Sequence, residues 1–182
     1  MRTKPFNNEV VYPDEPIVRV DRALIDHLKL GALANERQRM RLCAHRKVED
    51  SLHEMLIVHT SDTYVRPHKH INKSESFHVI EGLVDILLFD EQGEVTDVIQ
   101  MGDFNTGRHF YYRIDSPILH TLLIRSDIIV FHEATGGPFN RADTAFPSWA
   151  PDGSDPALTD KFVRKLDSQC RGLLARRRDG SL

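Results

Sequence analysis

A chain of 182 residues, 40% of them apolar, is long enough to bury a substantial core, and its formal net charge of −3 provides no overall basic field for nucleic acid. Two cysteines, Cys43 and Cys170, are too few for a disulfide framework, and no apolar run approaches the roughly 20 residues of a membrane span. Since the first residues also lack the apolar stretch of a signal peptide, we expect a cytoplasmic protein of one domain.

The first 50 residues predict an extended arm, a helix and an edge strand. Three prolines within residues 1–19 favour an extended arm that pairs with a sheet edge, in this chain or in a neighbouring subunit. Asp21 is a suitable N-cap, and apolar residues recur after it at helical spacing, which predicts an amphipathic helix to about Asn35. Alternation over residues 39–45 then predicts a strand with several basic residues on one face.

The stretch from residue 51 to residue 135 has the pattern of short strands separated by turns. No helical pattern interrupts this stretch, so an antiparallel sandwich or small barrel is favoured over a parallel α/β fold. The expected strands cover residues 52–60, 63–70, 75–80, 83–89, 94–101, 110–114, 119–124 and 128–133.

The last part of the chain is predicted to cover the β unit. After residue 136 the sequence is irregular and contains Phe139, Phe146 and Trp149, which fit core or lid positions better than a sugar-stacking platform. From about Thr159, apolar residues recur at helical spacing and predict a C-terminal amphipathic helix.

Three potential metal ligands lie close together between Arg66 and Gly82. His68 and His70 are two residues apart, so on an extended strand both side chains point to the same face. A polar break, Ile-Asn-Lys-Ser, separates them from Glu75, at the start of the next expected strand. Imidazole nitrogens and carboxylate oxygens are donors that first-row divalent metals prefer. Two neighbouring strands are therefore expected to aim three ligands into one space.

These residues resemble the first motif of the cupins, G-x5-H-x-H-x(3 or 4)-E-x6-G. His68, His70, Glu75 and Gly82 fit its spacing, with four residues before the glutamate and six after it, while Asp62 stands at the opening glycine. Three spaced ligands within a β-patterned sequence are a more specific signal than a single His-x-His pair.

The second cupin motif, G-x5-P-x-G-x2-H-x3-N, is matched less well. His120 fits its histidine, whereas Asp115, Pro117 and Ile124 stand where proline, glycine and asparagine would be. The resemblance still implies that His120 is a fourth ligand.

The resemblance implies an all-β fold, the cupin double-stranded β-helix or jelly roll, with N-terminal and C-terminal helices. We expect one cupin domain over residues 1–182. Its parts would be an N-terminal arm, helix and edge strand (1–50), a cupin core (51–135), and a covering segment with the C-terminal helix (136–182).

More narrowly, the chain looks like the WbuC-type cupin metalloproteins, which are associated with bacterial surface-polysaccharide loci. This likeness covers most of the chain from the first helix to Pro151, although Cys43 stands where an asparagine is common in that family. The residues that carry it are Arg39-Met-Arg41 with His45, Tyr64 to His70, Leu87 to Asp90, His120-Thr-Leu122, Gly137 to Phe139 and Phe146 to Pro151.

The expected cofactor is a divalent metal ion held by three histidines and one glutamate. Iron, manganese, nickel, cobalt and zinc all suit this donor set, and four protein ligands on an octahedral ion leave two positions open. The alternative is a cupin shell whose site is empty or only structural. Strand parity leaves open whether Tyr112 and Glu133 also reach the cavity.

A second group of polar residues suggests a ligand site beside the metal. Arg39, Arg41 and Arg66 are candidate substrate-binding residues, because guanidinium groups hold carboxylates or phosphates by paired hydrogen bonds. His45 and Tyr64 are candidate catalytic residues, with His45 as acid or base. The competing interpretation is a salt-bridged sheet edge without a catalytic role.

These features predict metal-dependent chemistry on a small anionic or polyhydroxylated molecule, such as the isomerisation or epimerisation of a sugar in surface-polysaccharide metabolism. Two alternatives remain, an iron-dependent dioxygenase and a metal-assisted small-molecule binding module without turnover. The expected partners are a small-molecule ligand and, by analogy, a second copy of the chain in a homodimer, with no nucleic acid and no membrane.

Overall fold

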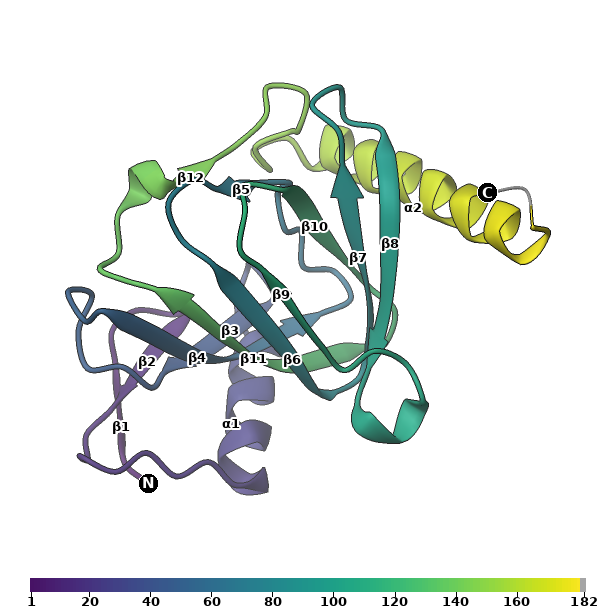
Figure 1. Cartoon of the computed structure of the whole chain (residues 1–182). Coiled ribbons are helices and arrows are strands. Elements are labelled where there is room, and N and C mark those ends of the chain that lie inside the picture. Colours follow the sequence, from purple (N-terminus) through teal and green to yellow (C-terminus); the bar gives the residue numbers. More distant parts are fainter. Residues whose placement is uncertain (181–182) are drawn as a thin grey trace.

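The computed structural model describes residues 1–180 and contains two β-sheets that pack against each other (Figure 1). The larger sheet has the strand order β1-β2-β3-β4-β11-β6-β9, and only the pairing of β2 with β3 is parallel. Its strands are β1 (Thr3–Pro5), β2 (Val10–Pro13), β3 (Arg39–Cys43), β4 (Leu52–Thr60), β6 (Glu75–Glu81), β9 (Tyr111–Ile114) and β11 (Ile128–Gly136).

The smaller sheet is antiparallel and has the order β10-β7-β8. A third ladder joins the short strands β5 and β12. The bounds of these strands are β5 (Lys69–His70), β7 (Leu83–Phe89), β8 (Val95–Gly102), β10 (Leu119–Ile124) and β12 (Thr144–Ala145), and the single 3-10 turns are η1 (Phe104–Thr106) and η2 (Arg141–Asp143).

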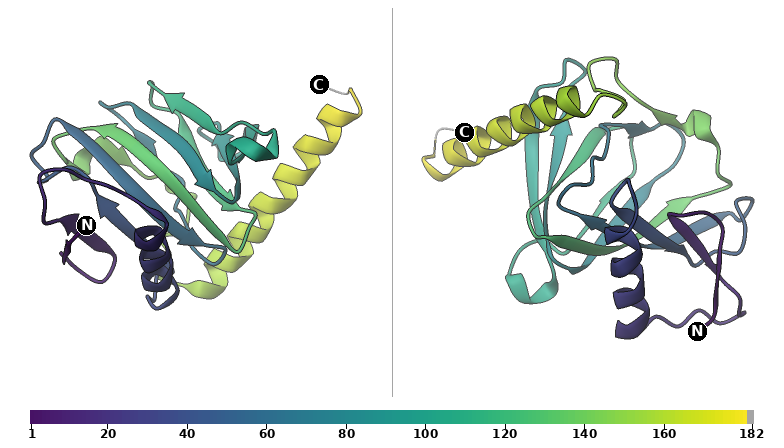
Figure 2. Two further views of the ribbon diagram at one scale, coloured as in Figure 1. Left: turned by 90° about the horizontal axis from the view of Figure 1, so that it is seen from below. Right: turned by 180° about the vertical axis from the view of Figure 1, so that it is seen from behind.

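The two helices lie on opposite outer faces of the sheets (Figure 2). Helix α1 (Arg22–Leu33) begins after Asp21, whose side chain accepts a hydrogen bond from the backbone N–H of Leu24 at 2.9 Å. Its buried side chains cover the outer face of β3, β4 and β11. Helix α2 (Pro156–Arg178) covers the outer face of the smaller sheet with Leu166, Cys170 and Leu173. No helix within residues 1–180 is long and apolar enough to cross a membrane.

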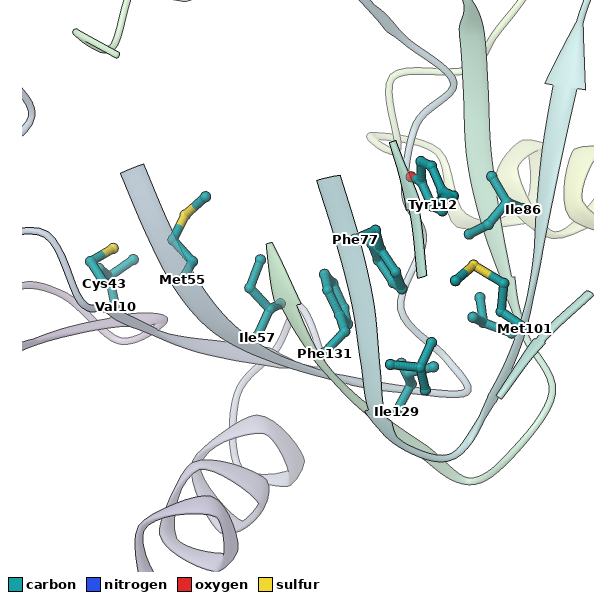
Figure 3. Packing of buried hydrophobic residues seen from close by; sticks show 12 residues of the cluster. Val10, Cys43, Met55, Ile57, Phe77, Ile86, Met101, Tyr112, Ile129 and Phe131 are labelled. Atoms are coloured by element: carbon teal, nitrogen blue, oxygen red, sulfur yellow. The ribbon is translucent and has the colours of Figure 1, made fainter. Parts of the chain in front are cut away.

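The central core lies between the inner faces of the two sheets (Figure 3). Alternation along each strand sends every second side chain into this space, which explains the largely apolar inner rows of β4, β6, β7 and β11. Phe77 and Phe131 stack at 4.0 Å between ring centroids, and both are almost completely buried. The antiparallel β-sandwich expected from the strand pattern is confirmed, and so is the jelly roll that the resemblance implies.

One expected strand is largely absent. Residues 63–67 have no regular structure, and the strand predicted over residues 63–70 reduces to an isolated bridge at His68 and the short strand β5. Strand β5 pairs with β12 of the covering segment and not with β6, as the sequence had suggested. The X-Pro step at Arg66-Pro67 disfavours a continuous ladder, because proline lacks the N–H that a ladder requires.

Candidate metal centre

Four side chains that can bind a metal converge at one end of the inner space. His70 lies on β5, Glu75 begins β6, His120 lies on β10, and His68 comes directly before β5. One ligand atom of each residue lies within 4.8 Å of those of the other three. The structure therefore brings together the four residues expected from the two motifs.

Backbone pairing explains why the two sheets meet at this point. The N–H of His68 donates to the carbonyl of His120 at 3.0 Å, and the N–H of His120 donates back to His68 at 2.9 Å. This bridge places the first histidine against the smaller sheet, while Glu75 belongs to the larger sheet. The site is thus a junction between the two sheets.

The three imidazole rings are oriented by partners at Nδ1. His68 donates from Nδ1 to the carbonyl of Arg66 at 2.8 Å, and His120 donates to the carbonyl of Ile118 at 3.0 Å. A carbonyl can only accept, so in the neutral rings Nε2 carries the free lone pair. His70 has a different partner at Nδ1, the hydroxyl of Thr144 at 3.3 Å. This arrangement fits metal-binding histidines, whose second nitrogen is held by an outer partner.

Glu75 is the central acceptor of the cluster. Its Oε2 lies 2.9 Å from Nε2 of His70, and its Oε1 lies 3.5 Å from Nε2 of His120. The hydroxyl of Tyr112 also donates to Oε1 at 3.0 Å. Burial by itself would raise the pKa of Glu75, but hydrogen bonds with His120 and His70 outweigh it and hold the pKa well below its usual value. The carboxylate is consequently ionised, as a metal ligand must be.

Among the histidines, His68 has the protonation that metal binding needs, whereas at His120 burial is outweighed by the hydrogen bond with Glu75, which raises the pKa of the ring. Burial, followed by the nearby His120, lowers the pKa of His68 to about 4, so the ring is neutral at pH 7. Burial and the Glu75 carboxylate raise the pKa of the Tyr112 hydroxyl well above its usual value, so the tyrosine remains a donor. The donor set is three nitrogens and one oxygen, which suits a divalent first-row metal.

Two of the candidate substrate-binding arginines lie on β3. Arg39 is occupied by an ion pair, since its Nε lies 2.7 Å from Oε2 of Glu9. Arg41 follows on the same face and is exposed. Strands β4 and β11 separate β3 from β6, so neither arginine adjoins the four clustered residues directly.

Arg66, the third candidate, is closer to the cluster. Its guanidinium carbon lies 4.8 Å from the ring centroid of Phe146, and that ring lies 6.1 Å from the ring of His68. Nε of Arg66 is buried and has no hydrogen-bond partner within residues 1–180. Arg66 and Phe146 thus form a wall beside the cluster, and Phe146 is 47% exposed.

The two candidate catalytic residues have other contacts. His45 stacks on His53 at 4.0 Å between ring centroids, and its Nδ1 lies 3.2 Å from the carbonyl oxygen of Glu54. Tyr64 donates its hydroxyl to the carbonyl of Pro151 at 2.9 Å. The structure does not bring either side chain into the cluster of four, and their catalytic roles stay predictions.

Sequence reasoning did not identify Thr144, which holds His70. The residue belongs to an irregular segment and reaches the site only because β12 pairs with β5, 74 residues away in the chain. No local pattern signals such a contact, so it could be found only in three dimensions.

Comparison with known proteins shows which fold the chain has. Residues 20–101 match the model of a family described as a domain of unknown function, DUF6016. A variant of salicylate 1,2-dioxygenase from Pseudoaminobacter salicylatoxidans, in complex with gentisate, is similar over 71% of this chain and 37% of that enzyme, with 13% identity and a TM-score of 0.52. The fold is that of the cupins. No curated protein matches the chain.

Two other solved structures have lower TM-scores. L-ribose isomerase from Cellulomonas parahominis is 13% identical over 62% of this chain and 70% of the enzyme, with a TM-score of 0.48. Oxalate decarboxylase from Bacillus subtilis is 14% identical over 59% of this chain and 27% of the enzyme, with a TM-score of 0.46. The chain spans only about a third of the dioxygenase's length and about a quarter of the decarboxylase's, and these identities concern the fold alone.

Proposed function

We propose that this protein is a metal-dependent cupin that acts on a small anionic or polyhydroxylated molecule. The observation that carries the proposal is the convergence of His68, His70, Glu75 and His120 within 4.8 Å, with an outer partner at Nδ1 of each histidine. A buried carboxylate in such a cluster is costly unless a cation or strong donors compensate it. A bound divalent ion would supply Lewis-acid activation of a carbonyl, a hydroxyl or a water molecule.

The chain's own residues would orient the reactants around that ion. Tyr112 holds Oε1 of Glu75, while Oε2 lies against Nε2 of His70, so the carboxylate is fixed among the candidate ligands. Arg66 and Phe146 form one wall of the site, where the guanidinium provides charge for an anionic group and the ring excludes water. This wall supports a role of Arg66 in substrate binding, as the sequence suggested.

The finer proposal is isomerase-type or epimerase-type chemistry on a sugar in surface-polysaccharide metabolism, in a WbuC-type cupin. Its support is the combination of open metal positions with charged side chains on the inner wall. An iron-dependent dioxygenase would use the same donor set. Oxygen uptake that requires iron(II) would favour the dioxygenase, whereas turnover with zinc or manganese without oxygen would favour the isomerase. A ligand that binds tightly and is recovered unchanged would indicate a binding module.

The metal assignment can be tested by elemental analysis of protein purified from its own host without chelators or a metal-affinity tag. We expect about one divalent ion per chain in the wild type and a loss of most of it in His70→Ala, because one of four ligands is removed. His78→Ala is the matched control, since His78 is an exposed histidine on β6, the strand that begins with Glu75. Full occupancy in His70→Ala would contradict the assignment.

The wider organisation also remains a proposal. We propose that residues 1–182 act as one cupin domain, that two copies form a homodimer, and that the protein works in the cytoplasm. Light scattering combined with size-exclusion chromatography would test the subunit number, and a monomer at micromolar concentration would refute the dimer.

A further inference from the structure

Glu133 is a carboxylate on the inner face of the larger sheet that lacks a partner. It lies on β11 between Phe131 and Thr135, both of which are buried on the same face. It makes no side-chain hydrogen bond and no ion pair with any residue in the described range 1–180. Burial, followed by repulsion from Glu75, raises its pKa to about 8. An inward carboxyl group without a partner lowers the stability of the fold. Its presence therefore points to a function in ligand binding.

The strand register places Glu133 close to the metal centre. Its pairing partner on β6 is Phe77, and Glu75 lies two residues earlier on the same face of that strand. Such diagonal neighbours on adjacent strands are about 7 Å apart at Cβ. Glu133 is thus one strand away from the metal ligands and faces the same inner space, but it does not belong to the group whose ligand atoms converge.

The same row of the sheet leads from Glu133 to β3. Met55 pairs with Glu133 on one side and with Cys43 on the other, and Figure 3 shows Cys43, Met55 and Phe77 along this inner face. These three side chains form an apolar floor. Arg41 precedes Cys43 by two residues and therefore shares its face.

Arg41 is a positive charge in the adjacent row of the same face, where it pairs with Ile57. Unlike Arg39, which is paired with Glu9, it has no acidic partner within 4.0 Å among residues 1–180, and it is exposed. Its charge acts on two residues of the row that contains Glu133. It opposes the rise that burial causes in the pKa of the Cys43 thiol, and it opposes the rise in the pKa of Glu133. The inner wall thus has an unpaired carboxyl group near the metal ligands and an unpaired guanidinium further out.

We propose that Glu133 and Arg41 form a second subsite, in which Glu133 accepts hydrogen bonds from hydroxyl groups and Arg41 holds the anionic end of a ligand bound at the metal centre. This rests on the proposed function and specifies its substrate class as a polyhydroxylated anion. Arg41 pairs with Ile57 and Glu133 pairs with Met55, so Arg41 lies two strands and two residues from Glu133, roughly 12 Å between their backbone positions. Both side chains start from the same face of the sheet, so one polyhydroxylated anion between them can meet Arg41 at its anionic end and Glu133 at its hydroxyl groups.

The test uses full-length protein loaded with manganese(II) and isothermal titration with defined probes. D-Gluconate and D-ribose 5-phosphate represent polyhydroxylated anions, sorbitol and D-ribose are their neutral counterparts, and inorganic phosphate is an anion without hydroxylated carbons. We expect at least one polyhydroxylated anion to bind about tenfold or more tightly than its neutral counterpart. Arg41→Met should remove most of that preference. Glu133→Gln should weaken the binding of the anion and of its neutral counterpart by the same factor. Neither variant should change the affinity for manganese.

Matched controls separate the subsite from general charge effects. Arg46→Met removes an exposed positive charge just beyond β3, and Glu54→Gln removes a negative charge on the outer face of β4. Both should bind the probes like the wild type. The subsite is refuted if no polyhydroxylated anion binds preferentially to the loaded wild type, if Arg41→Met binds it as tightly, or if only Arg66→Met weakens it.

The same titrations distinguish the two proposals. If the wild type binds no divalent metal, the proposed function fails and the subsite falls with it. If the metal binds but the affinities for the probes do not depend on Arg41 and Glu133, only the proposed subsite is refuted.

Discussion

At the scale of single residues, the metal centre depends on groups that never touch the metal. The carbonyls that orient His68 and His120 belong to the backbone and cannot be removed by substitution. The corresponding partner of His70 is a side chain, the hydroxyl of Thr144. This difference allows the outer partner of one ligand to be changed alone.

We expect Thr144→Val to weaken metal affinity about tenfold, because the isosteric side chain cannot accept the proton of His70 Nδ1. Thr144→Ser keeps the hydroxyl and should bind like the wild type. Competition with a chelating indicator measures the dissociation constant of each variant without any substrate. Equal affinities in the valine and serine variants would show that Thr144 does not position the ligand.

His59 gives a prediction about acid stability away from the metal centre. It is 8% exposed, its Nδ1 has no partner within residues 1–180, and burial, followed by the charge of Arg39, lowers its pKa to about 3. Because this value lies below the ordinary 6.5, the unfolded state takes up the proton first, and stability falls as the pH decreases from about 6.5 towards 3.

Between pH 7 and pH 5, His59 alone should therefore reduce the free energy of unfolding by about 2 kcal/mol. His59→Leu should remove this part of the pH dependence, while the exposed control His27→Gln should retain it. Urea unfolding of metal-free protein at the two pH values measures the difference. A leucine variant with the wild-type pH dependence would contradict the assignment.

At the scale of elements, the tight connection between β6 and β7 determines how the chain crosses from one sheet to the other. Gly82, the last residue of the first motif, has φ of +93°, and a Cβ at this position would lie 2.4 Å from the carbonyl oxygen of Ile128. A side chain here meets both an unfavourable backbone conformation and a backbone atom that cannot move easily. The motif therefore has a glycine at this position because of the tight packing of the β6–β7 connection and not because of metal binding.

Gly82→Ala should lower the free energy of unfolding by clearly more than Gly107→Ala. Gly107 also has a positive φ, +71°, but a Cβ there meets nothing within 4 Å, so only the conformational cost of about 1–2 kcal/mol applies. Chemical denaturation of the two variants gives the comparison. Equal losses would mean that the contact with Ile128 relaxes without cost.

The sequence was more informative for some elements than for others. The bounds of β4 and β7 match their predicted ranges, because apolar alternation ends at clear turn residues. The predicted strand over residues 63–70 was mostly wrong, since the same alternation occurs in an extended segment without a ladder. Local pattern indicates an extended chain but not its hydrogen-bond partner.

At the scale of the whole molecule, the metal centre connects the parts of the fold. Its residues come from both sheets and from the short ladder of β5 and β12, which holds the covering segment. A metal bound only by the folded state therefore stabilises all of these parts together.

We expect the melting temperature to rise with metal concentration. At a free metal concentration of one hundred times the dissociation constant, the gain in the free energy of unfolding is about 2.7 kcal/mol. Calorimetry with and without a chelator measures it, and His70→Ala should show little of the gain. An unchanged melting temperature in saturating metal would argue against a site that joins the sheets.

The sequence by itself determined the β-rich fold class, both helices and the four candidate ligands, because periodicity, capping and motif spacing are local properties of the chain. Only the tertiary structure decided that β5 pairs with β12, that Thr144 holds His70, and that Glu133 and Arg41 share an inner wall with the metal ligands. These relations depend on which strands become neighbours and in which register. A shift of one residue in register would turn each side chain to the opposite face, so the composition of the wall follows from pairing that no local pattern specifies.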